Sequence, residues 1–347
     1  MEKSEQITVG VIGTGGMGGM HVEHLHSRVP GARLAAVADV DTVRAERIAD
    51  KSGAAVFGDA VEMIQDDSIE AVVIASPDPT HAELTLECLR NEKPVLCEKP
   101  LADKAEDALK VVKAEVDLGG KLIQLGFMRH FDPQHLAVKE AVDSGAIGSP
   151  LVFKGWHRNP QAAPSAVTSE SIVTNSMIHD LDSVRWFFGT EIDEVFVRGI
   201  STKPELEGIY DLQLAQISVG GEFLATVEVY VNAGYGYEVG LEVVCENGTA
   251  HVAPFDEAMV RLEATQHQRI FTNPFDRFRE AFVTEMQRWT EALRSGRQPD
   301  GPDAWDGYAT VVTAESCIAS LRSRSPQRVT VPERPDLYSN ENIGVGR

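Results

Sequence analysis

The stretch that decides the fold runs from residue 8 to residue 18 and reads Thr8-Val9-Gly10-Val11-Ile12-Gly13-Thr14-Gly15-Gly16-Met17-Gly18. Its first five residues predict a short apolar strand, and the residues that follow can line one face of a helix. The glycines have the GxGxxG spacing in the order strand, turn, helix that a dinucleotide-binding unit requires. Gly13 permits the tight turn, Gly15 lets the backbone approach a pyrophosphate, and Gly18 lets helix and strand pack closely. The stretch therefore predicts a dinucleotide-binding domain.

An acidic residue follows at the distance expected for ribose recognition. A second apolar run, Leu34 to Ala38, ends in Asp39, about twenty positions after the last glycine of the motif. A carboxylate there accepts hydrogen bonds from the adenosine ribose hydroxyls and repels a 2′-phosphate. Val40 offers no compensating cation, and Arg44 is expected to point along the next helix. NAD is therefore favoured over NADP. The cofactor-binding residues expected in this region are Gly13, Gly15, Met17, Gly18 and Asp39.

Two further strand ends carry polar residues. The apolar run Ala71 to Ala75 ends in a turn-rich segment from Ser76 to His81, and the run Val95 to Cys97 ends in Glu98-Lys99-Pro100. Open parallel sheets place ligands in the crevice beyond their strand ends, where Lys99 would reach, with Pro100 fixing the turn behind it. Lys99 is therefore a candidate catalytic residue. The cofactor-binding candidates at these strand ends are Ser76, Pro77, His81, Glu98 and Lys99.

The pattern of apolar residues changes along the chain. Up to residue 126, short apolar runs alternate with helical patterns, as a parallel sheet with crossover helices requires. Beyond it, period-two stretches such as Phe223 to Val231 predict an antiparallel sheet. We therefore expect an α/β protein with a doubly wound parallel Rossmann sheet in residues 1–126. Residues 127–347 should form an α/β domain with a large open, mainly antiparallel sheet for substrate binding and oligomerisation.

Composition excludes several classes of function. The 347 residues carry a formal net charge of −21, and no Lys/Arg cluster stands out, so nucleic acids and anionic membranes are poor partners. No stretch approaches the length of a membrane span. The four cysteines lack CxxC spacing and the histidines are not clustered, so no metal site is expected and reduced thiols in a cytoplasm fit best. A small-molecule enzyme is favoured.

A predicted helix around residues 175–188 carries a second catalytic candidate. His179 and Asn175 are four residues apart, on one face and off the apolar stripe, with Asp182 beyond them to orient the imidazole. Oxidising a secondary alcohol requires a base with a pKa near neutral, and unperturbed histidine lies at about 6.5. We assign His179 as the base and Lys99 as proton relay or alkoxide stabiliser. The alternative is that His179 is an ordinary polar helix residue.

Polar loops supply candidate substrate contacts. His157 and Asn159 follow the strand Leu151 to Trp156 and could hydrogen-bond substrate hydroxyls, although such loops are often simply solvated. Tyr235 has the same two interpretations. Arg129 lies either near the cofactor crevice or in the connection between the domains.

Taken together, these motifs resemble the glucose-fructose oxidoreductase/inositol dehydrogenase/MocA family, and within it the bacterial inositol dehydrogenases. The resemblance covers nearly the whole chain and includes Gly126-Phe127-Met128-Arg129, Tyr235-Gly236-Tyr237 and Trp305-Asp306-Gly307-Tyr308. It implies a homotetramer and NAD-linked oxidation of one ring hydroxyl of a cyclitol, myo-inositol or a stereoisomer, to a ketone. It further implies that Lys99 and His179 carry the chemistry. The polyol would face His157, Asn159 and Tyr235, and Arg129 and Asn175 are the other two substrate-binding candidates.

One position departs from the inositol enzymes that the sequence resembles. They usually have an aspartate one helical turn before the histidine, where this chain has Asn175. An amide can bond a hydroxyl but carries no negative charge. The substrate could therefore be another cyclitol, a monosaccharide or an amino-sugar precursor. Two other classes remain open: a glycosidase that uses bound NAD without net NADH formation, and a non-catalytic NAD-binding sensor.

Overall fold

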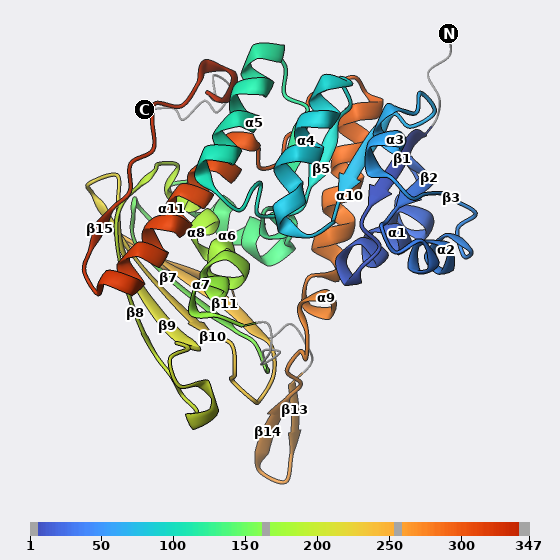
Figure 1. The fold of residues 1–347 in the computed structure, drawn as a ribbon. Coiled ribbons are helices and arrows are strands. Elements are labelled where there is room, and N and C mark those ends of the chain that lie inside the picture. The colour runs from blue at the N-terminus through green and yellow to red at the C-terminus, as the bar shows by residue number, and fades with distance from the viewer. Residues whose placement is uncertain (1–5, 162–166, 253–258, 340–347) are drawn as a thin grey trace. The chain divides into compact units, whose positions relative to one another are not determined.

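The computed structural model describes residues 6–161, 167–252 and 259–339 (Figure 1). The chain groups into two compact units. Unit 1 contains residues 1–127, 282–311 and the segment from Pro332, and unit 2 contains residues 128–281 and 312–331. The first boundary between the units follows Phe127, one residue after the domain boundary expected at 126. Two later segments that the sequence placed in the second domain pack with unit 1.

Unit 1 is built on a parallel sheet with the strand order β3-β2-β1-β4-β5-β6. The order reverses between β1 and β4, the switch point at which doubly wound sheets bind dinucleotides. Its strands are β1 (Ile7–Ile12), β2 (Ala32–Ala38), β3 (Ala55–Phe57), β4 (Ala71–Ile74), β5 (Val95–Cys97) and β6 (Ile123–Leu125). Its helices are α1 (Gly16–Ser27), α2 (Thr42–Ala49), α3 (Ala60–Gln65), α4 (His81–Arg90), α5 (Ala105–Leu118) and most of α10 (Arg279–Arg294).

The core of unit 1 explains why α10 belongs to it. Val9 and Val11 of β1 alternate with glycine and are fully buried, as the central strand of a two-sided sheet requires. Val22 and Leu25 of α1 pack into the same cluster. Met286 and Trp289 of α10, both 0% exposed, join it from far along the chain.

Unit 2 contains a seven-stranded sheet in the order β12-β11-β7-β10-β9-β8-β15. All pairs are antiparallel except β7 and β10, which run parallel, so the sheet is mixed and mostly antiparallel. Its strands are β7 (Pro150–Arg158), β8 (Ile192–Ile200), β9 (Leu212–Val219), β10 (Phe223–Tyr230), β11 (Glu238–Cys245), β12 (Thr249–Val252) and β15 (Gln327–Arg328). Its helices are α6 (Pro133–Asp143), α7 (Ser169–Ile172), α8 (Ile178–Phe188), α9 (Pro274–Arg277) and the second part of α11 (Ala304–Ser323).

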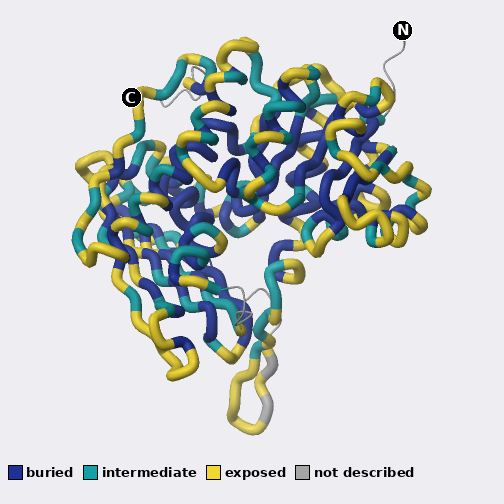
Figure 2. Tube along the Cα trace, in the orientation of Figure 1, coloured by how far each residue is buried: buried dark blue, intermediate teal, exposed yellow. Residues whose placement is uncertain are grey.

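One face of this sheet packs against helices. Val227 and Val229 of β10 are fully buried in the same cluster as Leu181 and Val184 of α8 and Cys317 of α11. The alternate residues of the strands point to the other face, which is half-buried or exposed (Figure 2). The period-two pattern of the sequence therefore sorts the strands into a helix-covered and an open face.

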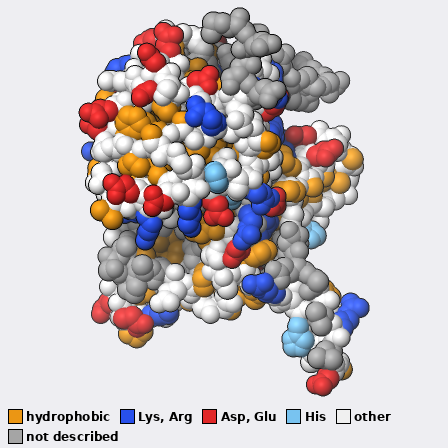
Figure 3. Space-filling model, turned by 90° about the vertical axis from the view of Figure 1, so that its right-hand side faces the viewer, with side chains coloured by type: hydrophobic (Ala, Val, Ile, Leu, Met, Phe, Trp, Pro, Cys, Tyr) orange, Lys and Arg blue, Asp and Glu red, His pale blue; other side chains and the backbone are white. Residues whose placement is uncertain are grey.

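A two-stranded hairpin, β13 (Met259–Leu262) with β14 (Thr265–Gln268), projects from unit 2 and carries charged and histidine side chains (Figure 3). Its turn residues Glu263 and Ala264 have φ values of 50° and 57°. Across the residues that the structure describes, no helix is long and apolar enough to cross a membrane.

Candidate functional site

The glycine-rich turn of unit 1 leaves an open cradle at the start of α1. Gly13 has φ +87°, and a Cβ on it would stand 2.5 Å from the Ala75 carbonyl oxygen. A Cβ on Gly18 would stand 1.9 Å from the Gly13 carbonyl oxygen, so only glycine fits either position. At Gly15 and Gly16, by contrast, an added Cβ would meet nothing within 4 Å beyond the local backbone. The helix N-terminus thus faces open space in which the backbone can approach an anionic group.

Asp39 is held rigidly at the end of β2. Its Oδ2 accepts from the Thr14 amide and hydroxyl, both at 2.7 Å, and its Oδ1 accepts from the Asp41 amide at 2.9 Å. Burial alone raises the pKa of this carboxyl, but these bonds and Arg44 outweigh it and lower the pKa to about 2. The expectation for Arg44 is wrong, because its guanidinium turns back and pairs with Asp39 at 2.7 Å. The expected direction of the Arg44 side chain came from the helix that carries it, and this gave no indication of the ion pair.

The polar segments after β4 and β5 lie at the ends of neighbouring strands. Ser76 is half-buried and its hydroxyl lies 2.6 Å from that of Thr80, while Pro77 is exposed. Lys99 is half-buried directly after β5. His81 is 1% exposed, and both ring nitrogens lie against backbone carbonyls, at Ser76 and Pro100. The parallel sheet thus brings these sequence-predicted residues to one edge.

Glu98 is 5% exposed, and its Oε1 lies 2.7 Å from His21 Nε2. Glu285 of α10 is 0% exposed, and neither of its carboxyl oxygens has a hydrogen-bond partner among the described residues. Burial, and then the Glu98 charge, raise the pKa of Glu285 well above its usual value. The Glu98 carboxylate is therefore buried and lies within hydrogen-bond distance of His21.

In unit 2, a buried ion pair supports a histidine. Arg129 is 1% exposed and donates from Nη1 to Asp180 at 2.7 Å. His157 Nδ1 lies 3.2 Å from the Ser176 carbonyl and 3.7 Å from Asp180 Oδ2, which are acceptors, and 3.4 Å from Arg129 Nη2, which is a donor. Burial lowers the pKa of His157, which favours its neutral form.

His179 lies beside this cluster. It is 7% exposed, and its ring centroid lies 6.2 Å from that of His157. Asn175 is exposed and belongs to a π-helical turn, Val173–Met177, that precedes α8. Such turns interrupt the α-helical spacing and are frequent at functional sites. The i, i+4 relation assumed between Asn175 and His179 therefore does not follow α-helical geometry.

The expectation for Asp182 is wrong. Its Oδ2 lies 2.8 Å from Nε2 of His130, whose ring stacks on Trp186, so Asp182 does not serve His179. Of the two remaining substrate candidates, Asn159 directly follows β7 and Tyr235 lies in the loop between β10 and β11. Asn159 donates to the Ser176 hydroxyl at 3.3 Å, and Tyr235, 48% exposed, donates to Glu238 at 2.6 Å.

Sequence reasoning assigned no role to Asp180 and no role of its own to Tyr237. Asp180 is 0% exposed and three residues after Met177 on the buried stripe of the helix, so its charge on an apolar face was a usable signal of a buried ion pair. Tyr237, 2% exposed, meets the His157 ring edge to face at 5.6 Å between centroids. The signal for Tyr237 was its place in the Tyr235-Gly236-Tyr237 motif.

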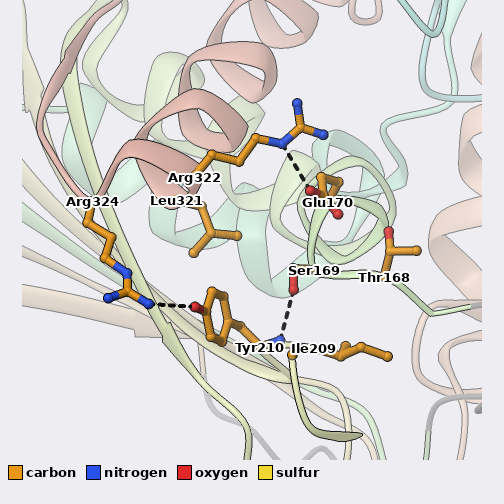
Figure 4. A pocket seen from close by; sticks show the side chains of 9 residues that line it. Thr168, Ser169, Glu170, Ile209, Tyr210, Leu321, Arg322 and Arg324 are labelled. Atoms are coloured by element: carbon orange, nitrogen blue, oxygen red, sulfur yellow. Dashed lines mark hydrogen bonds and ion pairs between the residues drawn. The ribbon is translucent and has the colours of Figure 1, made fainter.

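A hollow elsewhere on unit 2 contains none of the predicted site residues. In it Arg322 pairs with Glu170, and Arg324 donates to the Tyr210 hydroxyl (Figure 4). Within the described ranges, no group of three or more His, Cys, Asp or Glu side chains is arranged to hold a metal ion.

Two family models match the chain. Residues 7–127 match the model described as "Oxidoreductase family, NAD-binding Rossmann fold", and residues 135–251 match the GFO/IDH/MocA C-terminal domain. The chain is 59% identical over 339 residues to the inositol 2-dehydrogenase of Rubrobacter xylanophilus, with 97% of each chain covered.

Solved structures agree with these matches. The chain is similar to myo-inositol dehydrogenase from Lactobacillus casei in complex with NAD(H) and myo-inositol, with a TM-score of 0.92 and 34% identity over 96% of this chain and 100% of that one. It is also similar to scyllo-inositol dehydrogenase from Lactobacillus casei with bound NAD(H) and scyllo-inositol, with a TM-score of 0.88 and 26% identity, covering 93% of this chain and 99% of that one.

Proposed function

The chain belongs to the GFO/IDH/MocA family of oxidoreductases with an NAD-binding Rossmann fold, and on this premise we propose that it is an NAD-dependent inositol 2-dehydrogenase. The observation that carries the proposal is the 59% identity to an inositol 2-dehydrogenase over 97% of both chains. The reaction is the oxidation of one secondary ring hydroxyl of a cyclitol to a ketone. Unit 1 binds the cofactor and unit 2 binds the substrate.

The residues of unit 1 fit NAD. The open space at Gly15 and Gly16 suits a pyrophosphate at the start of α1, and the ionised Asp39 suits a ribose diol. When bound, NAD accepts the hydride that leaves the ring carbon. Met17, Ser76 and Pro77 contact the same cofactor. His81 and Glu98 are buried and act indirectly, by holding the segments after β4 and β5 in place.

The protein itself must remove the hydroxyl proton. His179 acts as the general base, because a histidine titrates near neutral pH and this one lies among other polar side chains of unit 2. Lys99 relays the proton or stabilises the developing alkoxide with its ammonium. The inositol hydroxyls contact Asn175, His157, Asn159 and Tyr235. Arg129 supports this set through Asp180 rather than by direct contact.

A substrate panel tests this proposal. Purified protein is incubated with NAD and, in turn, myo-inositol, scyllo-inositol, other stereoisomers, monosaccharides and amino sugars, and NADH is followed by absorbance. We expect the highest kcat/KM with an inositol. Turnover of a sugar alone would assign a sugar dehydrogenase instead. Cleavage of a glycoside without net NADH would assign a glycosidase, and binding of NAD without any turnover would assign a sensor.

We also propose a homotetramer that packs through the open face of the unit 2 sheet. Leu214 of β9 and Leu224 of β10 are 45% and 58% exposed on this face, so both side chains are available to a partner subunit. Leu214→Glu combined with Leu224→Lys should lower the mass measured by light scattering. An unchanged tetramer would exclude this face.

The four cysteines are free and buried, which fits a reducing cytoplasm.

A further inference from the structure

One histidine bridges the ends of two parallel strands. His81 is the first residue of α4 and is 1% exposed. Its Nδ1 lies 2.7 Å from the carbonyl oxygen of Pro100, after β5, and its Nε2 lies 2.9 Å from the carbonyl oxygen of Ser76, after β4. β4 and β5 are neighbours in the sheet, so a single ring ties the two strand-end turns together.

The two contacts determine the protonation of the ring. A backbone carbonyl only accepts hydrogen bonds, and a neutral imidazole has only one N–H. At these distances a neutral ring would place a lone pair against one of the two oxygens. Both nitrogens therefore carry hydrogen, and the side chain is an imidazolium.

The surroundings of His81 are consistent with this charge. Burial alone lowers the pKa of His81, but Cys97 of β5 and the two carbonyls outweigh it and raise the pKa to about 10. Asp103, in the loop before α5, also interacts electrostatically with His81, and Asp78, in the turn before α4, interacts with Asp103. The direction of this shift agrees with the charged ring that the two carbonyl contacts require.

We propose that His81 is a positioning residue, whose imidazolium fixes the Ser76 turn and the Pro100 turn relative to each other and thereby sets the position of Lys99. This inference rests on the proposed role of Lys99 in the dehydrogenase. Lys99 is joined covalently to Pro100, so a shift of the Pro100 carbonyl moves the backbone that carries the ammonium. Misplacing a reacting group by about 1 Å can cost roughly 100-fold in rate.

Two variants separate the contributions of charge and of the two bonds. His81→Leu removes both donors, and His81→Gln keeps an amide that can donate to one carbonyl but carries no charge. Thr85→Val is the matched control. Thr85 lies one turn later on α4, is 0% exposed, and its hydroxyl has no hydrogen-bond partner among the described residues.

We expect His81→Leu to lower kcat with inositol roughly 100-fold and to raise the dissociation constant for NADH, measured by fluorescence, several-fold. The KM for inositol should change little. His81→Gln should be intermediate, and Thr85→Val should match the wild type in all three quantities. A folded His81→Leu enzyme with wild-type kcat and NADH affinity would overturn the proposal.

A second measurement, made first on the wild type, does not depend on turnover. Nitrogen–proton correlation spectra of ¹⁵N-histidine-labelled, cofactor-free wild type at pH 8 should contain one ring with both nitrogens protonated, absent in His81→Gln. If every histidine were neutral at pH 8, the proposal would fail. Because the spectra and the NADH titration need no inositol, they remain informative even if the substrate panel disproves the dehydrogenase.

Discussion

At the scale of single residues, the two proposed catalytic side chains lie in different environments. Lys99 is half-buried after β5 of unit 1, and its neighbours on both sides are fixed, Glu98 by His21 and Pro100 by His81. His179 is nearly buried in unit 2. A reacting group is most effective when its supporting contacts are already made in the free protein.

Replacement of the lysine should separate chemistry from binding. Lys99→Met keeps most of the methylene stem and removes the ammonium, so turnover should fall by at least about 100-fold. NAD affinity, measured by calorimetry, should stay within a few-fold of the wild type. Near-normal turnover would remove Lys99 from the mechanism.

The Asp39–Arg44 pair makes a sharper prediction about cofactor choice. Asp39→Ser removes the carboxylate that repels a 2′-phosphate and at the same time releases Arg44, a cation that could bind that phosphate. The ratio of kcat/KM for NADP to that for NAD should therefore rise by at least about tenfold. The double variant Asp39→Ser/Arg44→Gln is the control. If it gains NADP activity equally, Arg44 has no part in the change.

At the scale of elements, the turn before α8 decides how Asn175 is presented. The π-helical turn Val173–Met177 leaves Asn175 exposed while Met177 and Ser176 are buried. An extra residue in a helical turn rotates the preceding side chains relative to those that follow.

Adding a charge at this turn should act through the general base. Asn175→Asp should raise the pKa of His179 and move the acidic limb of the pH–rate profile to higher pH. Asn175→Ala should leave a substrate hydroxyl unpaired and weaken transition-state binding by about 1–3 kcal/mol. Identical pH profiles and substrate rankings for both variants and the wild type would place Asn175 outside the pocket.

The Arg129–Asp180 pair connects α8 to the segment after β6. Both side chains are almost completely buried, at 1% and 0% exposed. Arg129→Met should lower the free energy of unfolding by about 3–5 kcal/mol, because it leaves the Asp180 charge buried without its partner. The matched control is Lys154→Met, which breaks the half-exposed pair with Glu242 and should cost about 1 kcal/mol or less. Equal losses in urea unfolding would contradict the assigned difference.

At the scale of the whole molecule, the last segment that the structure describes is bonded to α5, a helix much earlier in unit 1. The Tyr338 hydroxyl donates to Glu115 Oε2 at 2.7 Å, and Oε1 of the same carboxylate accepts from the amides of Leu122 and Ile123. Tyr338 also stacks on Trp305. Residues more than 200 positions apart along the chain thus share one buried contact.

This contact predicts a pH dependence of stability. Burial raises the pKa of Glu115 to about 7, from an ordinary value of 4.5, so the folded protein holds this proton more tightly than the unfolded chain. The stability that the proton contributes is complete below pH 4.5 and is lost as the pH rises towards 7, up to about 3 kcal/mol. Glu115→Gln keeps an oxygen for the amides and should flatten this loss in thermal unfolding between pH 5 and 8. An unchanged slope would assign the dependence to other groups.

The local signals in the sequence were sufficient for the fold class and the cofactor. The strand, the glycine turn and Asp39 lie within one βαβ unit, and their spacing is dictated by backbone sterics and by the pyrophosphate. The alternation in β9 and β10 likewise indicated a half-covered sheet, because side chains alternate across a strand. The role proposed for Lys99 rests on its place after a buried strand and stays a prediction.

The tertiary structure alone decided how the charged side chains pair. Asp182 binds His130 and not His179, Arg44 turns back to Asp39, and His81 faces two carbonyls. It also showed that most of α10 packs in unit 1, where Trp289 is buried. A sequence pattern records which face of an element is apolar but not which distant segment covers it. Ion pairs and buried hydrogen bonds depend on that second fact, since their strength falls steeply with distance and exposure.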